Sequence, residues 1–174
     1  MSSGGRVFFC EGMYRGAVEP DRKKYSNYSL HRIMTPDPVT ITPGTTAGEA
    51  MRIMERRGFH HLPVTEKRPG GPDRLVGMVA KGDLQRVISA FVGSKIETAR
   101  DRQTANLRVQ SFMTKEVFTL PPDSGIRECA GLLRAKRFNS VPIVDPETSR
   151  LIGIVTSADL LEFLQDVLGR GLKK

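Results

Sequence analysis

The chain contains one block of sequence twice. Residues 34–64 align with residues 113–143 at a constant offset of 79 and without a gap. Residues 74–84 then align with residues 150–160 at an offset of 76, so the three-residue difference falls in one loop, residues 66–73. Each copy has about 50 residues, a size at which a single core is marginally stable. We therefore expect the copies to pair about a pseudo-two-fold axis and to create two related clefts.

Composition limits the class of protein. Hydrophobic residues make up 39% of the 174 residues and charged residues 26%, which is typical of a soluble globular protein. No apolar run approaches 18 residues and no signal-peptide core is present, so we expect a cytoplasmic protein without a membrane span. The two cysteines, Cys10 and Cys129, have no metal-ligand spacing, and Cys129 is expected to be a buried free thiol.

The formal net charge of +8 favours a polyanionic partner. Nucleotide phosphates, nucleic acid and an acidic protein all satisfy this condition, and a basic surface without a partner satisfies it equally well. The charge therefore leaves the class of partner open.

Hydrophobic spacing predicts the same elements in both copies. Extended segments are expected at 38–41 and 117–120, and hairpin strands at 61–64 with 75–79 and at 141–144 with 151–155. A first helix in each copy is marked by apolar residues at helical spacing: Ala47, Ala50, Met51 and Met54, and Ile126, Cys129, Ala130 and Leu133. A turn with a helix cap at 43–46 begins the first of these helices, and Gly58 ends it. A second helix is marked by Leu84, Val87, Ile88 and Phe91, and by Leu160, Phe163, Leu164 and Val167.

These elements give an α/β (α+β) fold with two pseudo-symmetric β-α-β-β-α repeats packed through their sheets. We divide the chain into an irregular basic arm at 1–27, a first repeat at 28–92, a polar and partly helical linker at 93–108, and a second repeat at 109–170.

The two copies resemble the CBS domain family. The resemblance is carried by the order MT, VxTxxP, an amphipathic helix, FHHLPV or FNSVPIVD, and finally GMVAKGDL or GIVTSADL. It covers about residues 29 to 168. Two tandem copies are similar to the Bateman modules of this family. The resemblance implies a regulatory module that binds AMP, ADP, ATP, NAD or S-adenosylmethionine between its repeats, and that commonly forms a homodimer.

The end of the second hairpin is the first candidate site. Thr156, Ser157 and Asp159 lie where a strand gives way to a helix, and a helix N-terminus offers free N–H groups to phosphate. The Asp159 carboxylate can accept hydrogen bonds from both hydroxyls of a ribose. The spacing of Thr156 and Asp159 also fits a capping box, which is an alternative without a ligand. The resemblance implies that Val39, His60 and His61 form the other wall of this first cleft.

A second, weaker site corresponds to it in the first repeat. Asp83 occupies the position of Asp159, but Ala80 replaces Thr156, and an Asp without a Thr partner is harder to explain as half of a capping box. Lys81 is a candidate phosphate contact. The resemblance implies that Phe118, Asn139 and Ser140 complete this cleft.

The adjacent His60 and His61 point to opposite faces of an extended segment, so we do not expect a shared metal. No P-loop, paired-carboxylate site or nucleophile elbow is present, and we expect binding rather than catalysis. Two alternatives remain: a nucleic-acid-binding protein, suggested by the charge but not by the 6% aromatic content, and a scaffold that dimerises without a ligand.

Overall fold

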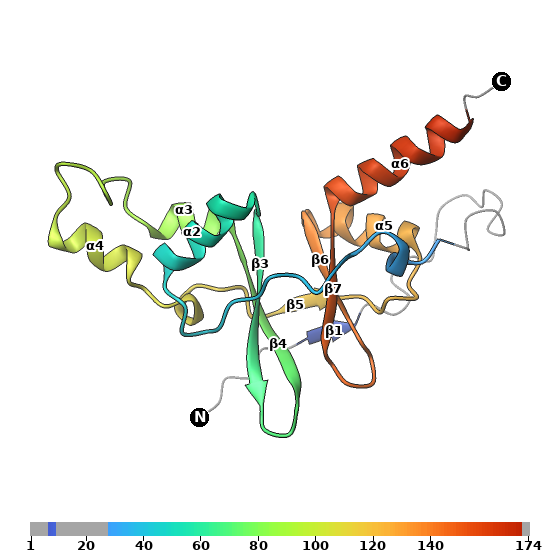
Figure 1. The fold of residues 1–174 in the computed structure, drawn as a ribbon, viewed down its shortest axis with the longest axis horizontal. Coiled ribbons are helices and arrows are strands. Elements are labelled where there is room, and N and C mark those ends of the chain that lie inside the picture. The colour runs from blue at the N-terminus through green and yellow to red at the C-terminus, as the bar shows by residue number, and fades with distance from the viewer. Residues whose placement is uncertain (1–6, 10–27, 172–174) are drawn as a thin grey trace. The chain divides into compact units, whose positions relative to one another are not determined.

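The computed structural model describes residues 7–9 and 28–171 and divides into two compact units. Of the described residues, unit 1 contains residues 7 and 39–117, and unit 2 contains residues 8–9, 28–38 and 118–171. Each unit is a mixture of helices and antiparallel strands, which confirms the predicted α/β class (Figure 1).

The two units are built from matching elements. Unit 1 contains α2 (Ala47–Arg57), β3 (His61–Arg68), β4 (Gly71–Ala80), α3 (Lys81–Val87), α4 (Ala99–Ala105) and the 3₁₀ turn η2 (Val109–Ser111). Unit 2 contains the 3₁₀ turn η1 (Leu30–Arg32), β2 (Thr35–Pro36), α5 (Ile126–Lys136), β6 (Ser140–Val144), β7 (Leu151–Thr156) and α6 (Ser157–Gly171). In each unit the helices lie at the end of the hairpin away from its turn (Figure 1). A separate sheet pairs β1 (Val7–Phe9) with β5 (Val117–Thr119).

The first helix of unit 1 begins and ends at the residues expected from the sequence. The Thr46 side chain accepts a hydrogen bond from Glu49 N–H, and the Glu49 carboxylate accepts one from Thr46 N–H, which completes a capping box. Gly58 ends α2 in the left-handed region at φ 69°, a conformation that costs glycine little. In unit 2, Arg137 takes this position at φ 56°.

The compact units do not follow the sequence repeats, because each unit takes its first segment from the other repeat. Leu30 lies at the start of the first repeat, yet it is fully buried in the core of unit 2 with Leu120, Cys129 and Val155. Its counterpart 79 residues later, Val109, is fully buried in the core of unit 1 with Ile41 and Leu84. The repeated sequence therefore builds two cores in which the opening segments are exchanged. We call these the exchanged segments: residues 28–36, which join unit 2, and residues 107–115, which join unit 1.

The same backbone hydrogen bonds hold both exchanged segments. In unit 2, Leu30 N–H donates to Ser124 O at 2.9 Å, and Ile126 N–H donates to Tyr28 O at 3.2 Å. In unit 1 the matching bonds are Val109 N–H to Thr45 O at 2.9 Å and Ala47 N–H to Leu107 O at 2.8 Å. Each exchanged segment also reaches the hairpin, where Thr35 pairs with Ile154 and Thr114 pairs with Met78.

A methionine on each exchanged segment packs against a glycine of the hairpin. A Cβ added at Gly153 would lie 2.6 Å from Met34 Sδ, and one added at Gly77 would lie 2.6 Å from Met113 Sδ. The Gly77 Cβ would also lie 3.0 Å from the backbone oxygen of Thr114. These two Met–Gly pairs explain why Met and Gly recur at matching positions of both repeats: glycine lets the exchanged segment approach the strand closely.

Several sequence expectations need correction. The loop expected at 66–73 is largely strand, because β3 runs to Arg68 and β4 begins at Gly71. Helix α3 ends at Val87, so Ile88 is extended, and Phe91 lies outside the helix with 51% of its surface exposed.

Two residues that were expected on the buried apolar faces of helices are exposed instead. Ala130 is exposed, and Leu132 is buried with Cys129 and Leu133 instead. Leu164 on α6 is 50% exposed. In α5, apolar residues at helical spacing lie on two adjacent faces, so spacing alone does not show which face is buried. In α6, apolar residues cover more of the helix surface than the core buries.

Other expectations concern the N-terminal arm, the linker and the cysteines. Within the arm expected to be irregular, Val7–Phe9 forms β1, and Cys10 lies outside the described residues. The linker contains α4, as the partly helical expectation required. Cys129 is a buried free thiol, as predicted. Burial, with smaller contributions from Glu128 and Asp159, raises the pKa of this thiol to about 12.

The Met113–Gly77 contact predicts a large cost for a small change. Gly77→Ala should lower the free energy of unfolding by about 1–3 kcal/mol, because the new methyl group pushes Met113 and the Thr114 backbone away from β4. Urea denaturation of the full chain measures this. Gly82→Ala is the matched control, because no atom lies within 4 Å of a Cβ there, and it should be neutral or stabilising. Equal stability of Gly77→Ala and the wild type would contradict the close approach.

Candidate functional site

The junction of β7 and α6 in unit 2 is the candidate functional site. Thr156 N–H and Thr156 Oγ1–H both donate to Asp159 Oδ2, at 2.6 and 2.7 Å. Asp159 N–H donates to Thr156 Oγ1 at 3.4 Å. The capping box is therefore formed. It occupies one carboxylate oxygen, and within the described residues Oδ1 accepts no hydrogen bond, so capping leaves an acceptor for a ligand.

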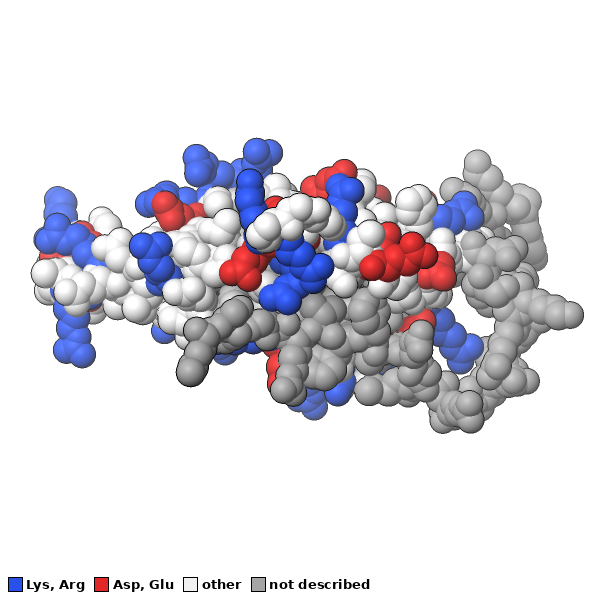
Figure 2. Space-filling model, turned by 90° about the horizontal axis from the view of Figure 1, so that it is seen from below, with Lys and Arg blue, Asp and Glu red and all other residues white. Residues whose placement is uncertain are grey.

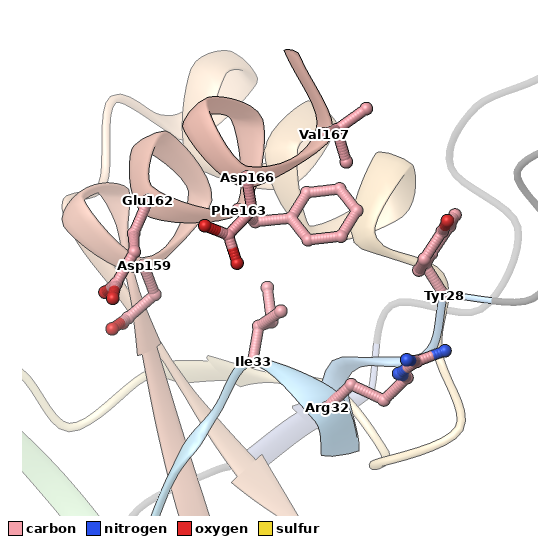
Figure 3. Close-up of a pocket in the computed structure, with 8 residues that line it drawn as sticks. All are labelled: Tyr28, Arg32, Ile33, Asp159, Glu162, Phe163, Asp166 and Val167. Carbon is pink, nitrogen blue, oxygen red and sulfur yellow. The ribbon is translucent and has the colours of Figure 1, made fainter. Parts of the chain in front are cut away.

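Asp159 also lines a pocket of about 440 Å³ that lies wholly within unit 2. One wall is the outer face of α6 and the other is the exchanged segment before β2 (Figure 3). The lining residues are Tyr28, Arg32, Ile33, Asp159, Glu162, Phe163, Asp166 and Val167.

The pocket combines an apolar wall with a charged rim. Ile33, Phe163 and Val167 supply apolar surface, and the rings of Tyr28 and Phe163 meet edge to face with centroids 5.0 Å apart. The Arg32 guanidinium lies over the Tyr28 ring, 5.4 Å from its centroid. A flat aromatic group fits such an apolar wall, while polar groups at the rim can orient it.

Two residues predicted for the second cleft lie beside Thr156 in unit 2. Ser140 pairs with Thr156 across the hairpin, and Ser157 N–H donates to Asn139 O at 3.1 Å. Phe118 lies on β5, where its ring contacts Phe138 and the Lys136 ammonium group lies 4.7 Å from its centroid. Unit 2 thus contains Asn139, Ser140 and Phe118 together with the Thr156–Asp159 junction.

The corresponding junction of unit 1, between β4 and α3, differs in its polar contacts. Ala80 N–H donates to Asp83 Oδ2 at 2.9 Å, so Asp83 makes half of a capping box even though Ala80 has no side-chain acceptor. The sequence made this half of a capping box harder to expect, because Ala80 replaces the Thr partner. The other oxygen of Asp83 forms an ion pair with Arg86. The two candidate carboxylates are therefore occupied differently.

The histidine pair adjoins this junction. His61 pairs with Ala80 across the hairpin, and Lys81 N–H donates to His60 O at 2.8 Å. His60 is exposed and His61 is partly buried. Burial lowers the pKa of His61 below its ordinary value, nearby His60 lowers it further, and Asp83 acts in the opposite direction. Val39, at the start of unit 1, is 38% exposed.

The structure thus groups the sequence-predicted residues by unit. Val39, His60, His61, Lys81 and Asp83 belong to unit 1, and the other candidates belong to unit 2. The combination of residues from both repeats in each cleft stays a prediction. Within the described residues, no group of three His, Cys, Asp or Glu side chains is arranged to hold a metal ion.

The sequence missed most of the pocket. Phe163 and Val167 were expected in the core stripe of α6, and Tyr28, Arg32 and Ile33 precede the duplicated block. The exchange of segments brings these residues onto α6. One signal was available: at the offset of 76, Glu162 takes the place of Arg86, which marks a change of charge beside the candidate carboxylate.

Comparisons with known proteins show what the duplicated block is similar to. The CBS domain family model matches residues 30–90 and 109–166. The chain is 28% identical over 138 residues to the uncharacterized protein MJ1225 of Methanocaldococcus jannaschii, covering 79% of this chain and 47% of that protein. It is 29% identical over 140 residues to a CBS domain-containing protein of Dictyostelium discoideum, covering 80% and 92%.

Solved structures agree with this fold. The crystal structure of MJ1225 matches with a TM-score of 0.65, over 79% of this chain and 48% of that chain. The CBS domain pair of protein MJ0100, in complex with 5′-methylthioadenosine and S-adenosyl-L-methionine, matches with a TM-score of 0.62 at 24% identity, over 78% and 98%. CBSX2 in complex with AMP matches with a TM-score of 0.66 at 22% identity, over 82% and 99%.

The chain spans about half the length of MJ1225. It spans 22% of the inosine-5′-monophosphate dehydrogenase of the same organism, to which it is 31% identical over 130 residues.

The lowered pKa of His61 predicts acid sensitivity of unit 1. An unfolded chain binds the proton near pH 6.5, before the folded chain does, so the free energy of unfolding should fall as pH drops below that value. His61→Gln should make this loss smaller between pH 7.5 and pH 5.5, as measured by urea denaturation. His31→Gln, which removes an exposed imidazole from unit 2, should keep the wild-type dependence. Identical pH dependence of His61→Gln and the wild type would refute the role of burial.

Proposed function

Because the chain belongs to the CBS domain family, we propose that it is a regulatory module that binds an adenosyl ligand rather than an enzyme. The proposal rests on one observation above all: Asp159, singled out from the sequence as a ribose ligand, lines the pocket between α6 and the exchanged segment. The complexes of the MJ0100 domain pair and of CBSX2 with adenosyl compounds support the ligand class.

The pocket suggests how such a ligand is held. Asp159 Oδ1 accepts a ribose hydroxyl, while Oδ2 stays in the capping box with Thr156. The apolar wall of Ile33, Phe163 and Val167 covers a face of the adenine. Ser157 and Asn139 adjoin Asp159 at the same junction. We propose that Val39, His60 and His61 contact the same ligand, as the sequence predicts. The candidate ligands are AMP, ADP, ATP, NAD and S-adenosylmethionine.

Occupancy would act through segments from both repeats. The pocket wall is formed by residues at the start of the first repeat and by the last helix of the second. A ligand that contacts both favours the arrangement in which they are held together, and so biases an equilibrium between two arrangements. A regulated partner would respond to this shift.

We propose a homodimer as the assembly. Leu161, Leu164 and Leu168 on α6 are 62%, 50% and 55% exposed and lie three and four residues apart, so they form one apolar row. A second copy of the chain would cover this row. Light scattering over a range of concentrations measures the mass. Twice 19.3 kDa, reduced to one chain by Leu164→Glu, is the expected result, and a wild-type monomer would contradict the proposal.

The basic charge does not lead us to propose nucleic acid as the partner. On the face drawn in Figure 2, Lys and Arg side chains are interspersed with Asp and Glu among the described residues. Non-specific binding to nucleic acid relies on a continuous basic groove with stacking aromatic residues.

No described helix has the length and apolar character needed to cross a membrane. We assign the module to the cytoplasm, where a free thiol such as Cys129 stays reduced.

The proposed function predicts ligand-dependent stability. S-adenosylmethionine, AMP, ADP, ATP and NAD are each added during thermal denaturation, with GMP as the control. A bound ligand at a hundred times its dissociation constant adds about 2.7 kcal/mol, a shift of roughly 5–10 °C for a domain of this size. Asp159→Asn, which keeps an acceptor for Thr156, should weaken binding at least about tenfold through loss of a charge-assisted hydrogen bond.

Asp123→Asn is the matched control, because Asp123 is exposed on a turn of the same unit and does not line the pocket. It should bind as the wild type does. The absence of a shift with every adenosyl ligand, or wild-type affinity in a folded Asp159→Asn variant, would refute the proposal.

A further inference from the structure

The charges around the two candidate carboxylates are opposite in the two units. In unit 2 the pocket contains three carboxylates, Asp159, Glu162 and Asp166, and one guanidinium, Arg32, which gives a formal net charge of minus two. In unit 1 the residues that correspond to Ser157 and Glu162 are Lys81 and Arg86. The repeats have the same fold but present different charges to anything bound there.

Arg32 does not neutralise the carboxylates of the pocket. Its guanidinium lies over the Tyr28 ring and, within the described residues, is not ion-paired with Asp159, Glu162 or Asp166. Figure 3 shows the Asp159 and Glu162 side chains at one end of the pocket and Arg32 at the other. In unit 1, by contrast, Arg86 forms an ion pair with Asp83 directly.

Two of the first N–H groups of α6 are already bonded within the chain. The first N–H groups of a helix usually bind anions because they lack partners. Here Ser157 N–H already donates to Asn139 O at 3.1 Å, and Asp159 N–H donates to Thr156 Oγ1 at 3.4 Å. A phosphate would therefore find two of the usual donors occupied and would meet a pocket of its own sign.

From these charges we propose that the pocket of unit 2 takes an adenosyl ligand whose 5′ substituent is a sulfonium or thioether, and that it discriminates against 5′-phosphates. This rests on the proposed function, which places the adenosine in this pocket. With the ribose at Asp159, a 5′ substituent that extends along α6 meets Glu162 and Asp166. A sulfonium is attracted by these carboxylates, a thioether is tolerated, and a phosphate of nearly two negative charges is repelled.

The charge at position 162 supplies the direct test. S-adenosylmethionine, 5′-methylthioadenosine and AMP are titrated calorimetrically into the full chain, in an Asp83→Asn background that removes the matching carboxylate of unit 1. S-adenosylmethionine should bind at least about tenfold more tightly than AMP, because each exposed carboxylate changes affinity by about two- to fivefold and several act together. Methylthioadenosine, which carries no charge, should fall between them.

Glu162→Arg, which introduces the side chain of the other repeat, should reduce the preference for S-adenosylmethionine over AMP at least about fivefold, and Glu162→Gln about twofold. Glu147→Gln removes an exposed charge from the β6–β7 turn, at the end of the hairpin away from Thr156, and should leave the preference unchanged. Raised salt should weaken S-adenosylmethionine and strengthen AMP.

The outcomes separate this inference from the proposed function. Binding of AMP at least as tight as that of S-adenosylmethionine, or a preference unchanged by Glu162→Arg, overturns the ligand class while the adenosyl-binding module stands. A chain that binds none of the three compounds overturns the proposed function and the ligand class with it.

Discussion

The contact between a methionine of one repeat and a glycine of the other determines how this chain folds. Met34 packs on Gly153 in unit 2, and Met113 packs on Gly77 in unit 1. Each contact holds a segment that would otherwise leave a hairpin edge unpaired and a core incomplete, since Leu30 and Val109 are carried on the same segments. A repeat cut at its sequence boundaries would lose one of these segments, so neither core would be complete.

The exchange also creates the candidate site. Helix α6 follows β7 directly, and its outer face would be open to solvent without the segment of residues 28–36. The exchanged segment places Tyr28 against Phe163 and supplies Ile33 and Arg32 to the same pocket. The candidate pocket and the core of unit 2 therefore depend on the same stretch of chain, so a ligand held there would contact segments of both repeats.

Much of this could be predicted from the sequence, because its signals are local. Thr46, Glu49 and Gly58 mark the ends of α2 through their own hydrogen bonds and backbone preference. The β7–α6 junction was predictable from the spacing of Thr156 and Asp159. The exchange was not, because spacing within a repeat cannot show which of two equivalent cores a flanking segment joins. The pocket was missed for the same reason, and Leu164 was expected in the core because hydrophobic spacing does not show which faces of α6 are covered.

The two repeats keep one fold while their junctions diverge. Thr156, Ser157 and Glu162 of the second repeat correspond to Ala80, Lys81 and Arg86 of the first. None of these residues belongs to the buried cores. These positions can therefore differ without disturbing the packing of either core. The chain thus has two related junctions with different chemistry, and the proposed adenosyl site is the pocket of unit 2.

Isoleucine methyl NMR during titration with S-adenosylmethionine tests this account most directly. Ile33 lies on the exchanged segment and lines the pocket, whereas Ile41 and Ile53 belong to unit 1. We predict a saturable change in the Ile33 δ1-methyl signal, with smaller changes for Ile41 and Ile53. Saturable changes at Ile41 and Ile53 that leave Ile33 unaffected, or no change at any of the three, would contradict a ligand site built on the exchanged segment.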